Sequence, residues 1–298
     1  MRGEALRILY ATESGIAVPY LTNLLNKLRD SGAITLREFK WQRLGVAGKS
    51  PDTSQYDIFI YQVLRDLDTT VQDEFFLKSQ CRRVLFDSQD SGTGDRYPQF
   101  AGMNIPRIKN CPHVSVMASQ NVVFATTFPT RSIKNKLHKQ SIDISFRVRD
   151  RPGSMWGDIR RRIRRLLKKY PRGKKDLEYG RDLYYPDYLQ KVRISVNAPG
   201  NGEACIRHLL TLQAGSCMLA HESINGIRLL PTRDLVDGVE YVSFNEKNLY
   251  SKLDRLMGDR DYRESIAARG RQAFKACSQD AAAGELHKVL KRIVRKGR

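Results

Sequence analysis

The chain has 298 residues, enough for two domains of about 130–150 residues each. Hydrophobic residues make up 41% of it, an ordinary share for a globular protein, and no apolar run approaches the ~18 residues of a membrane span. The composition therefore predicts neither a disordered chain nor a membrane-spanning segment. Lysine and arginine number 52 against 32 acidic residues, and the net charge of +20 predicts a polyanionic partner: nucleic acid, an anionic membrane surface or a phosphorylated small molecule.

Cysteine usage and the first residues bear on the compartment. The five cysteines are widely scattered and lack C-x-x-C spacing, so we interpret them as reduced thiols of an intracellular protein. The N-terminus passes directly into a predicted strand and lacks the apolar core of a signal peptide. We therefore expect a cytoplasmic protein.

The N-terminal half alternates between strand and helix patterns. Leu6–Ala11 is a compact apolar run that favours a buried parallel strand, and Val18–Leu28 places its leucines on one helical face before Gly32. The other predicted elements are the strands Ile34–Phe39, Tyr56–Leu64, Arg83–Phe86, Val114–Ala118 and Val122–Ala125 and the helix Gln72–Ser79. This alternation indicates an open, mostly parallel sheet.

The polar stretch Thr126–Asn135 is a reasonable domain boundary, and a second α/β succession follows it. Its predicted strands are Ile142–Val148, Val192–Val196, Ser216–Ala220 and Val239–Phe244. Its predicted helices are Trp156–Tyr170, Tyr185–Lys191, Glu203–Ala214, Glu246–Met257, Asp261–Cys277 and Ala281–Val294. Because both halves alternate in the same way, we expect two similar domains that face each other.

The segment from Val192 to Glu222 predicts a phosphate site. A strand leads into a loop at Asn197–Gly202, which contains Gly200 and Gly202, and a helix follows with Arg207 one turn inside it. A helix start offers unpaired N–H groups and a positive dipole end, and an arginine adds a charged fork for phosphate. The alternative interpretation is an ordinary βαβ unit with a solvated helix arginine.

Ligands of open α/β sheets bind beyond the carboxyl ends of the strands. In the N-terminal half this rule selects acidic residues, namely Glu13, Asp66, Asp87 and Asp90. In the C-terminal half it selects Arg149, Arg151, the Asn197–Gly202 loop, His221 and Glu222. Carboxylates on one wall and cations on the other suit group transfer from a phosphorylated donor. Each acid could instead be a turn residue or a helix cap.

The densest positive charge lies in Arg160–Lys175, whose pattern predicts an amphipathic helix with a cationic exterior. A solvated face, attachment to an anionic membrane and contact with nucleic acid all remain open for it. Zinc spacing, an RNP-like strand and a helix-turn-helix pattern are lacking, so nucleic acid is the disfavoured partner. Neither a metal site nor a P-loop is predicted, because the histidines do not pair at ligand spacing and no Walker sequence occurs.

Three stretches of the second half carry a family resemblance: YLQKVRISVNAPGNGEACIRHLLTLQAGSCMLAHE, LVDGVEYVSF and NLYSKLDRLMGDRDYRESIAARGRQAF. Together they resemble the C-terminal domain of GT-B glycosyltransferases, closest to the CgeB type with some likeness to the exostosin type. The most specific part is the tail formed by Gly238–Phe244 and Asp259–Gly270. The resemblance covers roughly Ile142–Phe274, and the N-terminal half supports it only through its α/β pattern and strand-end acids.

The sequence departs from the family pattern at two places. Related sequences commonly have a glutamate three residues after the arginine of the helix start, where Leu210 follows Arg207 here. Either Glu203 or Glu222 takes that role, or the donor pocket is altered or inactive. The glycine that is common after the first strand of the C-terminal domain is also absent, and Arg147–Arg149 stands in its place.

The resemblance implies an α/β protein with two Rossmann-like domains facing a central cleft. The N-terminal acceptor domain would span residues 1–130, the nucleotide-sugar domain 131–275, and a last helix, 276–298, would pack back on the first domain. A catalytic base is expected from Asp87, Asp90 or Glu13. The residues expected to bind the donor are Arg149, Asn197, Gly200, Gly202, Arg207, His221 and Glu222.

The expected function is transfer of a sugar from a nucleotide-sugar donor, UDP- or GDP-linked, to a hydroxyl of a glycan or other acceptor. The resemblance implies that the transfer needs neither metal nor cofactor. The alternative is a non-catalytic basic protein that keeps the GT-B fold and binds nucleic acid or an anionic membrane. A peripheral membrane position through Arg160–Lys175 is compatible with either function.

Overall fold

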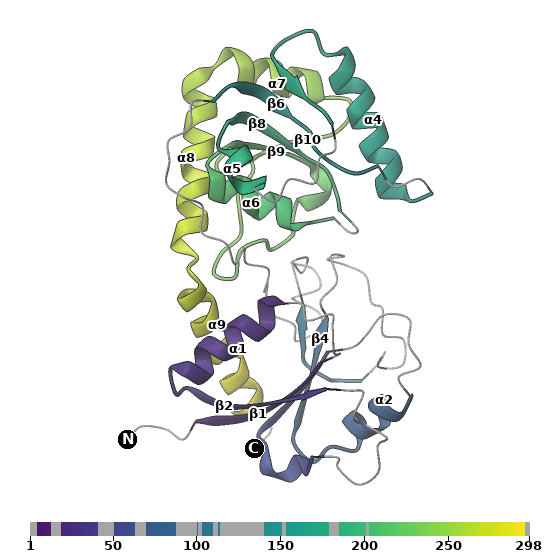
Figure 1. Cartoon of the computed structure of the whole chain (residues 1–298), viewed down its shortest axis with the longest axis vertical. Helices are drawn as coiled ribbons and strands as arrows, with labels where there is room; N and C mark the ends of the chain where they lie inside the picture. The colour runs from purple at the N-terminus through teal and green to yellow at the C-terminus, as the bar shows by residue number, and fades with distance from the viewer. Residues whose placement is uncertain are drawn as a thin grey trace. The chain divides into compact units, whose positions relative to one another are not determined.

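A computed structural model describes residues 5–12, 19–40, 51–62, 70–87, 100, 103–109, 113, 140–150, 153–178, 185–200 and 203–295. The chain divides into two compact units (Figure 1). Unit 1 comprises Met1–Gln89, Thr93–Thr127 and Gln279–Arg298, and unit 2 comprises Asp90–Gly92 and Phe128–Ser278.

Unit 1 is built on a parallel sheet with the strand order β2-β1-β3-β4-β5. Its strands are β1 (Leu6–Thr12), β2 (Ile34–Lys40), β3 (Ile58–Gln62), β4 (Arg82–Asp87) and β5 (Arg107–Lys109). Its helices are α1 (Pro19–Asp30), α2 (Thr70–Leu77) and α9 (Gln279–Arg295), with a 3-10 turn at Thr53–Gln55. The register places Ile8 of β1 beside Ile58 of β3, so the two most apolar strands are neighbours at the centre.

Both faces of this sheet are buried, as expected of parallel strands. On one face α1 and α9 cover β1, β3 and β4, and Leu25 and Leu286 both lie in that core without solvent exposure. On the other face Phe76 of α2 packs edge to face against Phe59 of β3, with ring centroids 5.2 Å apart. Lys27 pairs with Asp280 at 2.6 Å. The prediction that the last helix packs back on the N-terminal domain is confirmed.

Unit 2 contains a second parallel sheet, with the order β10-β9-β8-β6-β7. Its strands are β6 (Ile142–Ser145), β7 (Lys175–Asp176), β8 (Val192–Asn197), β9 (Cys217–His221) and β10 (Val242–Phe244). Its helices are α4 (Met155–Lys169), α5 (Tyr185–Leu189), α6 (Ile206–Ala214), α7 (Leu249–Gly258) and α8 (Arg260–Ala276), with a 3-10 turn at Glu222–Ile224. Numbered within each unit, both sheets have the strand order 2-1-3-4-5, so the predicted pair of similar Rossmann-like domains is confirmed.

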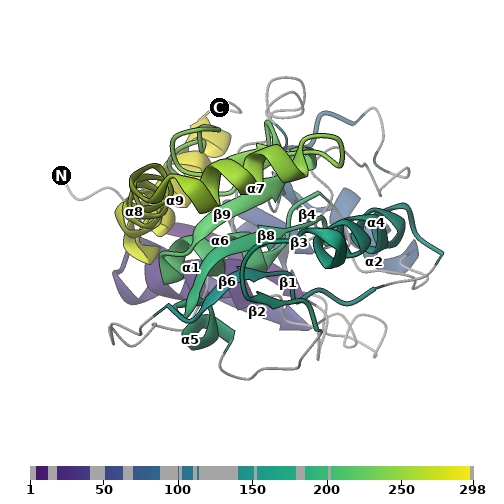
Figure 2. The same ribbon diagram turned by 90° about the horizontal axis from the view of Figure 1, so that it is seen from above.

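Helices from different parts of unit 2 cover its sheet. Leucine and isoleucine side chains of α4, α7 and α8 form one core with the sheet, for example Ile163, Leu253 and Ile266. The helices α5 and α6 contact β8. In Figure 2, α7 and α5 lie to either side of the strands β8 and β9.

Local sequence signals mark several element ends. Gly215 ends α6 with φ of 77°, a left-handed conformation that glycine adopts without strain. Ser154 begins α4 by accepting a hydrogen bond from the Gly157 N–H at 3.1 Å, and Asp259 begins α8 in the same way with Tyr262 at 2.8 Å. The predicted strands Val114–Ala118 and Val122–Ala125 lie outside the described residues.

Gly270 marks a close approach between α8 and the rest of unit 2. A Cβ at this position would lie 2.7 Å from the Glu240 carbonyl oxygen and 2.8 Å from Leu212 Cδ2. Only glycine lets the helix reach this distance, because the first of these contacts is backbone.

We expect Gly270→Ala to lower the free energy of unfolding by about 1–3 kcal/mol, because the added methyl forces α8 away from its seat. Gly284 of α9 is the matched control, since a Cβ there meets no atom within 4 Å. Gly284→Ala should raise stability by up to ~1 kcal/mol through helix propensity. Urea unfolding of both variants measures the difference, and equal effects would contradict the packing described.

Candidate functional site

The strand order of unit 2 reverses between β6 and β8, which creates a switch point at the carboxyl end of the sheet. Ligands of sheets with this order bind at the corresponding crevice. The loop after β6 contains Arg149, Asn197 is the last residue of β8, and Gly200 lies in the loop that follows β8. Three of the predicted donor-binding residues therefore lie at the switch point.

Arg160 of α4 joins the two loops of this switch point. Its side chain is 5% exposed. The guanidinium donates to the carbonyl oxygens of Arg149 at 2.9 Å and Pro199 at 2.7 Å, and also to that of Gly200. One turn later, Arg164 donates to the Val148 carbonyl at 2.5 Å and to the carboxylate of Asp150. A planar fork with five donors suits such a task, and the two arginines fix the backbone of both loops.

The start of α6 follows the second loop and brings together a thiol, an imidazole and a guanidinium group. Cys205 is the N-cap residue, and its sulfur lies 3.5 Å from His208 Nδ1 and 3.8 Å from Arg207 Nη1. The Cys205 N–H also donates to His208 Nδ1 at 3.1 Å. His208 is fully buried, whereas Arg207 and Cys205 are half-buried. Half-buried Arg207 thus lies in the first turn of the helix.

Burial opposes ionisation of the Cys205 thiol, but the neighbouring His208 and Arg207 and the hydrogen bonds to the sulfur outweigh it and lower the thiol pKa to about 6. The opposite holds for Cys217 inside the sheet, where burial raises the pKa to about 12. The first turn of α6 is therefore a place that stabilises negative charge.

Local contacts explain why residue 200 is a glycine and residue 197 an asparagine. A Cβ on Gly200 would lie 2.8 Å from the Cys205 Cβ, so the loop needs glycine to pass over the helix start. Asn197 is fully buried and donates to the Ser195 carbonyl at 3.1 Å and to Thr211 Oγ1 of α6 at 3.2 Å. Asn197 therefore ties the end of β8 to α6.

A second group of polar side chains lies at the ends of β9 and β10. His221 is 6% exposed, and its Nδ1 accepts from the Ser223 N–H at 3.2 Å while Nε2 lies 3.5 Å from Glu246. Burial lowers the pKa of His221. The imidazole is therefore neutral at pH 7 with its proton on Nε2, facing the Glu246 carboxylate. Glu222 is exposed, and its carboxylate accepts from Asn245 Nδ2 at 2.9 Å.

Arg162 completes this group from the exposed side of α4, donating to Glu246 at 3.0 Å. Burial raises the pKa of Glu246, but hydrogen bonds from its own backbone and from Arg162 outweigh that effect and lower it. The ends of β9 and β10 thus present a fixed set of carboxylates and imidazole next to the switch point.

Of the predicted catalytic acids, Asp87 is the one that the structure describes, and it belongs to unit 1. Asp87 ends β4, is 4% exposed and pairs with Lys109 of β5 at 2.5 Å. The two side chains sit directly opposite in the register, so the sheet itself forms this pair. Glu13 and Asp90, together with Gly202 of the donor loop, lie outside the described residues.

The charge run Arg160–Lys175 divides between the interior and the surface. Arg160 and Arg164 turn inward to carbonyl groups, while Arg165, Lys168 and Lys169 are exposed. The exterior of α4 is therefore less cationic than the sequence suggests. Across the described segments, no helix combines the length and apolar content needed to cross a bilayer. Nor do three His, Cys, Asp or Glu side chains of those segments gather in a way that could hold a metal ion.

Several of these features escape sequence reasoning. The inward turn of Arg160 and Arg164 had a signal, because the two recur at i and i+4 beside the apolar positions of α4. Cys205 as N-cap was missed because the helix was expected to begin at Glu203, and Glu246 was assigned to a helix that begins at Leu249. The short strands β5 and β7 contain mostly charged residues, which mask a strand pattern.

Neither a protein-family model nor a curated protein matches the sequence. Among solved structures, the chain is similar to HepE of Anabaena in complex with UDP-glucose, with a TM-score of 0.55, 11% identity and coverage of 96% of this chain and 100% of that one. It is similar to sucrose-phosphate synthase of Thermosynechococcus elongatus, with a TM-score of 0.57, 11% identity and coverage of 98% and 100%. It is also similar to a DNA modifying β-glucosyltransferase, studied with and without UDP-glucose, with a TM-score of 0.53, 14% identity and coverage of 97% of this chain and 99% of that one.

The fold is that of the GT-B glycosyltransferases. The two parallel five-stranded sheets and the similarity over nearly the whole length of both chains establish it, as the sequence resemblance implied.

We expect Arg160→Met to lower the free energy of unfolding by about 2–4 kcal/mol, because three carbonyl groups lose a charged donor in a buried place. Arg165→Met on the exposed side of α4 removes the same charge and should change stability by less than about 0.5 kcal/mol. Chemical denaturation distinguishes them. Similar midpoints for the two variants would show that the loops do not depend on Arg160.

Alkylation by iodoacetamide should separate Cys205 from Cys81. The reaction needs the thiolate, so its rate at Cys205 should rise as pH passes about 6 and then level off. Burial raises the pKa of Cys81, so labelling there should keep rising well above pH 8. Peptide mass spectrometry after short pulses gives both profiles from one sample, and a shared profile would refute the environment described for Cys205.

Proposed function

We propose that the protein is a glycosyltransferase that moves a sugar from a nucleotide-sugar donor to a hydroxyl of a glycan or other acceptor. The observation behind this proposal is the switch point of unit 2, where Arg160 holds two loops beside the start of α6 and Arg207. HepE and the DNA modifying enzyme were both studied with UDP-glucose, which supports a UDP-linked donor, and a GDP-linked donor is the other candidate.

The donor's diphosphate would bind at the start of α6. Arg207 and the first N–H groups of the helix would neutralise its charge, and the exposed Arg149 would approach from the loop after β6. The loop from Asn197 through Gly200 to Gly202 would let the phosphates come close to the backbone. During transfer the same groups would stabilise the departing nucleoside diphosphate, whose negative charge increases as the glycosidic bond breaks.

His221 and Glu222 would contact the sugar or the nucleoside. The exposed Glu222 carboxylate, fixed by Asn245, is a good acceptor for sugar or ribose hydroxyls. It would take the place of the glutamate that Leu210 replaces. Glu203, half-buried just before α6, is the other candidate for that role.

A carboxylate base, Asp87, Asp90 or Glu13, would deprotonate the acceptor hydroxyl if the reaction inverts. Asp87 is buried and paired with Lys109, so Asp90 or Glu13 is better suited to meet an acceptor. Transfer would not need a metal ion, because cationic side chains and the helix start supply the positive charge. Activity retained in EDTA would support this part of the proposal.

Arg207→Ala should weaken binding of the preferred nucleotide sugar by about 10–100-fold, because a hydrogen bond to a charged group contributes about 1.5–3 kcal/mol. Thermal unfolding with a panel of nucleotides and nucleotide sugars measures this. A ligand at about 100 times its Kd adds roughly 2.7 kcal/mol of stability.

The matched control is Arg165→Ala, which removes one positive charge from an exposed site of the same unit and should leave binding unchanged. Equal affinity in wild type and Arg207→Ala would contradict the assigned diphosphate site. If no nucleotide or nucleotide sugar stabilised the wild type, the proposed activity itself would fail.

A further inference from the structure

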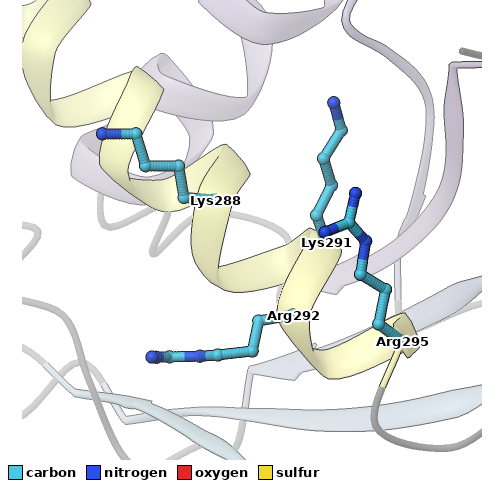
Figure 3. Close-up of a pocket in the computed structure, with 4 residues that line it drawn as sticks. All are labelled: Lys288, Lys291, Arg292 and Arg295. Carbon is cyan, nitrogen blue, oxygen red and sulfur yellow. The ribbon is translucent and has the colours of Figure 1, made fainter.

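A second concentration of positive charge lies on α9, in unit 1. Lys288, Lys291, Arg292 and Arg295 are all exposed and line a hollow of about 420 Å³ (Figure 3). Figure 3 shows their side chains projecting from the helix, with Lys291 and Arg295 close together in that view. We call these four residues the α9 cationic face.

The spacing of this face follows from the helix. The four residues stand at i, i+3, i+4 and i+7, so they form one stripe about 10 Å long. The opposite side of α9 is apolar and lies in the core of unit 1, where Ala282, Leu286 and Leu290 are buried. Burial of that side fixes which way the stripe points, and it faces solvent.

Little negative charge offsets the stripe. Lys288 pairs with Glu285 at 2.7 Å, and no acidic residue lies between Glu285 and Arg295. Within the described segments, Lys291, Arg292 and Arg295 form no ion pair with an acidic side chain. Lys291 and Arg295, which lie close together in Figure 3, repel each other as like charges, so an anion that bridges them would relieve the repulsion as well as bind.

The length of the α9 cationic face indicates the class of anion. A stripe of about 10 Å matches a line of phosphates, because duplex DNA presents one negative charge per ~1.7 Å along its axis. The long side chains can track such a backbone without reading its sequence.

A lipid surface fits the stripe less well. Helices that lie in a membrane interface insert an apolar face, and the apolar face of α9 is occupied by the core of unit 1. The large exposed apolar side chains of the described segments are Val71, Met103, Met155 and Val236, none of which belongs to α9. The surface therefore offers charge without an apolar anchor.

We propose that the α9 cationic face binds the phosphate backbone of a nucleic acid. The sequence disfavoured such a partner because it contains no nucleic-acid motif, but backbone binding requires only positioned cations. This inference does not depend on the donor site, since every residue of the face lies in unit 1 and the donor site lies in unit 2.

The test uses the full chain and fluorescein-labelled 20-nucleotide DNA, single-stranded and duplex, in anisotropy titrations from about 50 to 300 mM salt. The variant is Lys291→Gln/Arg292→Gln/Arg295→Gln. We expect at least a 10-fold loss of affinity at about 100 mM salt, and a log–log salt slope smaller by about 2–3, since three phosphate contacts are removed.

The matched control is Arg165→Gln/Lys168→Gln/Lys169→Gln, which removes the same charge from exposed positions of α4. It should change affinity by less than about 3-fold. Circular dichroism and Tm of both triple variants verify folding, since cations in the last turn also favour the helix dipole. Equal losses in the two variants would mean a general charge effect and would overturn the proposal.

Phosphatidylserine vesicles are the competing probe. We expect the α9 cationic face to bind DNA more tightly than these vesicles. If the wild type bound the vesicles and not DNA, with vesicle binding lost in the α9 triple variant, that result would overturn the proposal and identify an anionic membrane as the partner. Absence of DNA binding at about 50 mM salt would also overturn the proposal. Nucleotide-sugar binding should be the same in both triple variants, so a failed donor site would be recognised separately.

Discussion

The buried fork of Arg160 is the interaction on which the site depends. It links the backbone of the loop after β6 to that of the loop after β8, and these two loops border the switch point of the sheet. An arginine can satisfy several carbonyl groups at once, and its burial is tolerated because those acceptors replace water. These hydrogen bonds hold the described parts of both loops next to the start of α6.

The positive charge of the chain has three separate tasks. Arg160 and Arg164 stabilise the loops of unit 2 from inside. Arg207 lies in the first turn of α6, and Arg162 reaches from α4 to Glu246 after β10, near where a phosphorylated donor would bind. The α9 cationic face belongs to the surface of the other unit. A net charge of +20 therefore does not indicate one partner, because part of it is structural and the rest lies on two units.

Apolar strands and amphipathic helices could be predicted because their periodicity records which face is buried. The βαβ unit around Asn197 and Gly215 is an example, as is the return of α9 to unit 1. Periodicity places Arg160 and Arg164 beside the apolar positions of α4, but it does not reveal which carbonyl groups their guanidinium groups reach, so the sequence assigns Arg160 to the exterior. The Asp87–Lys109 pair depends on the register of β4 and β5, which a single sequence does not specify.

The central claim is that the nucleotide sugar's diphosphate binds at the loops held by Arg160 and at the start of α6. Hydrogen–deuterium exchange with and without the stabilising nucleotide sugar tests it most directly, because slowed exchange maps the amides that bind or become ordered. We predict the strongest added protection in peptides covering Val192–Gly200 and Cys205–Leu209. Protection confined to peptides of unit 1, with those of β8 and α6 unchanged by a ligand that demonstrably binds, would contradict the account.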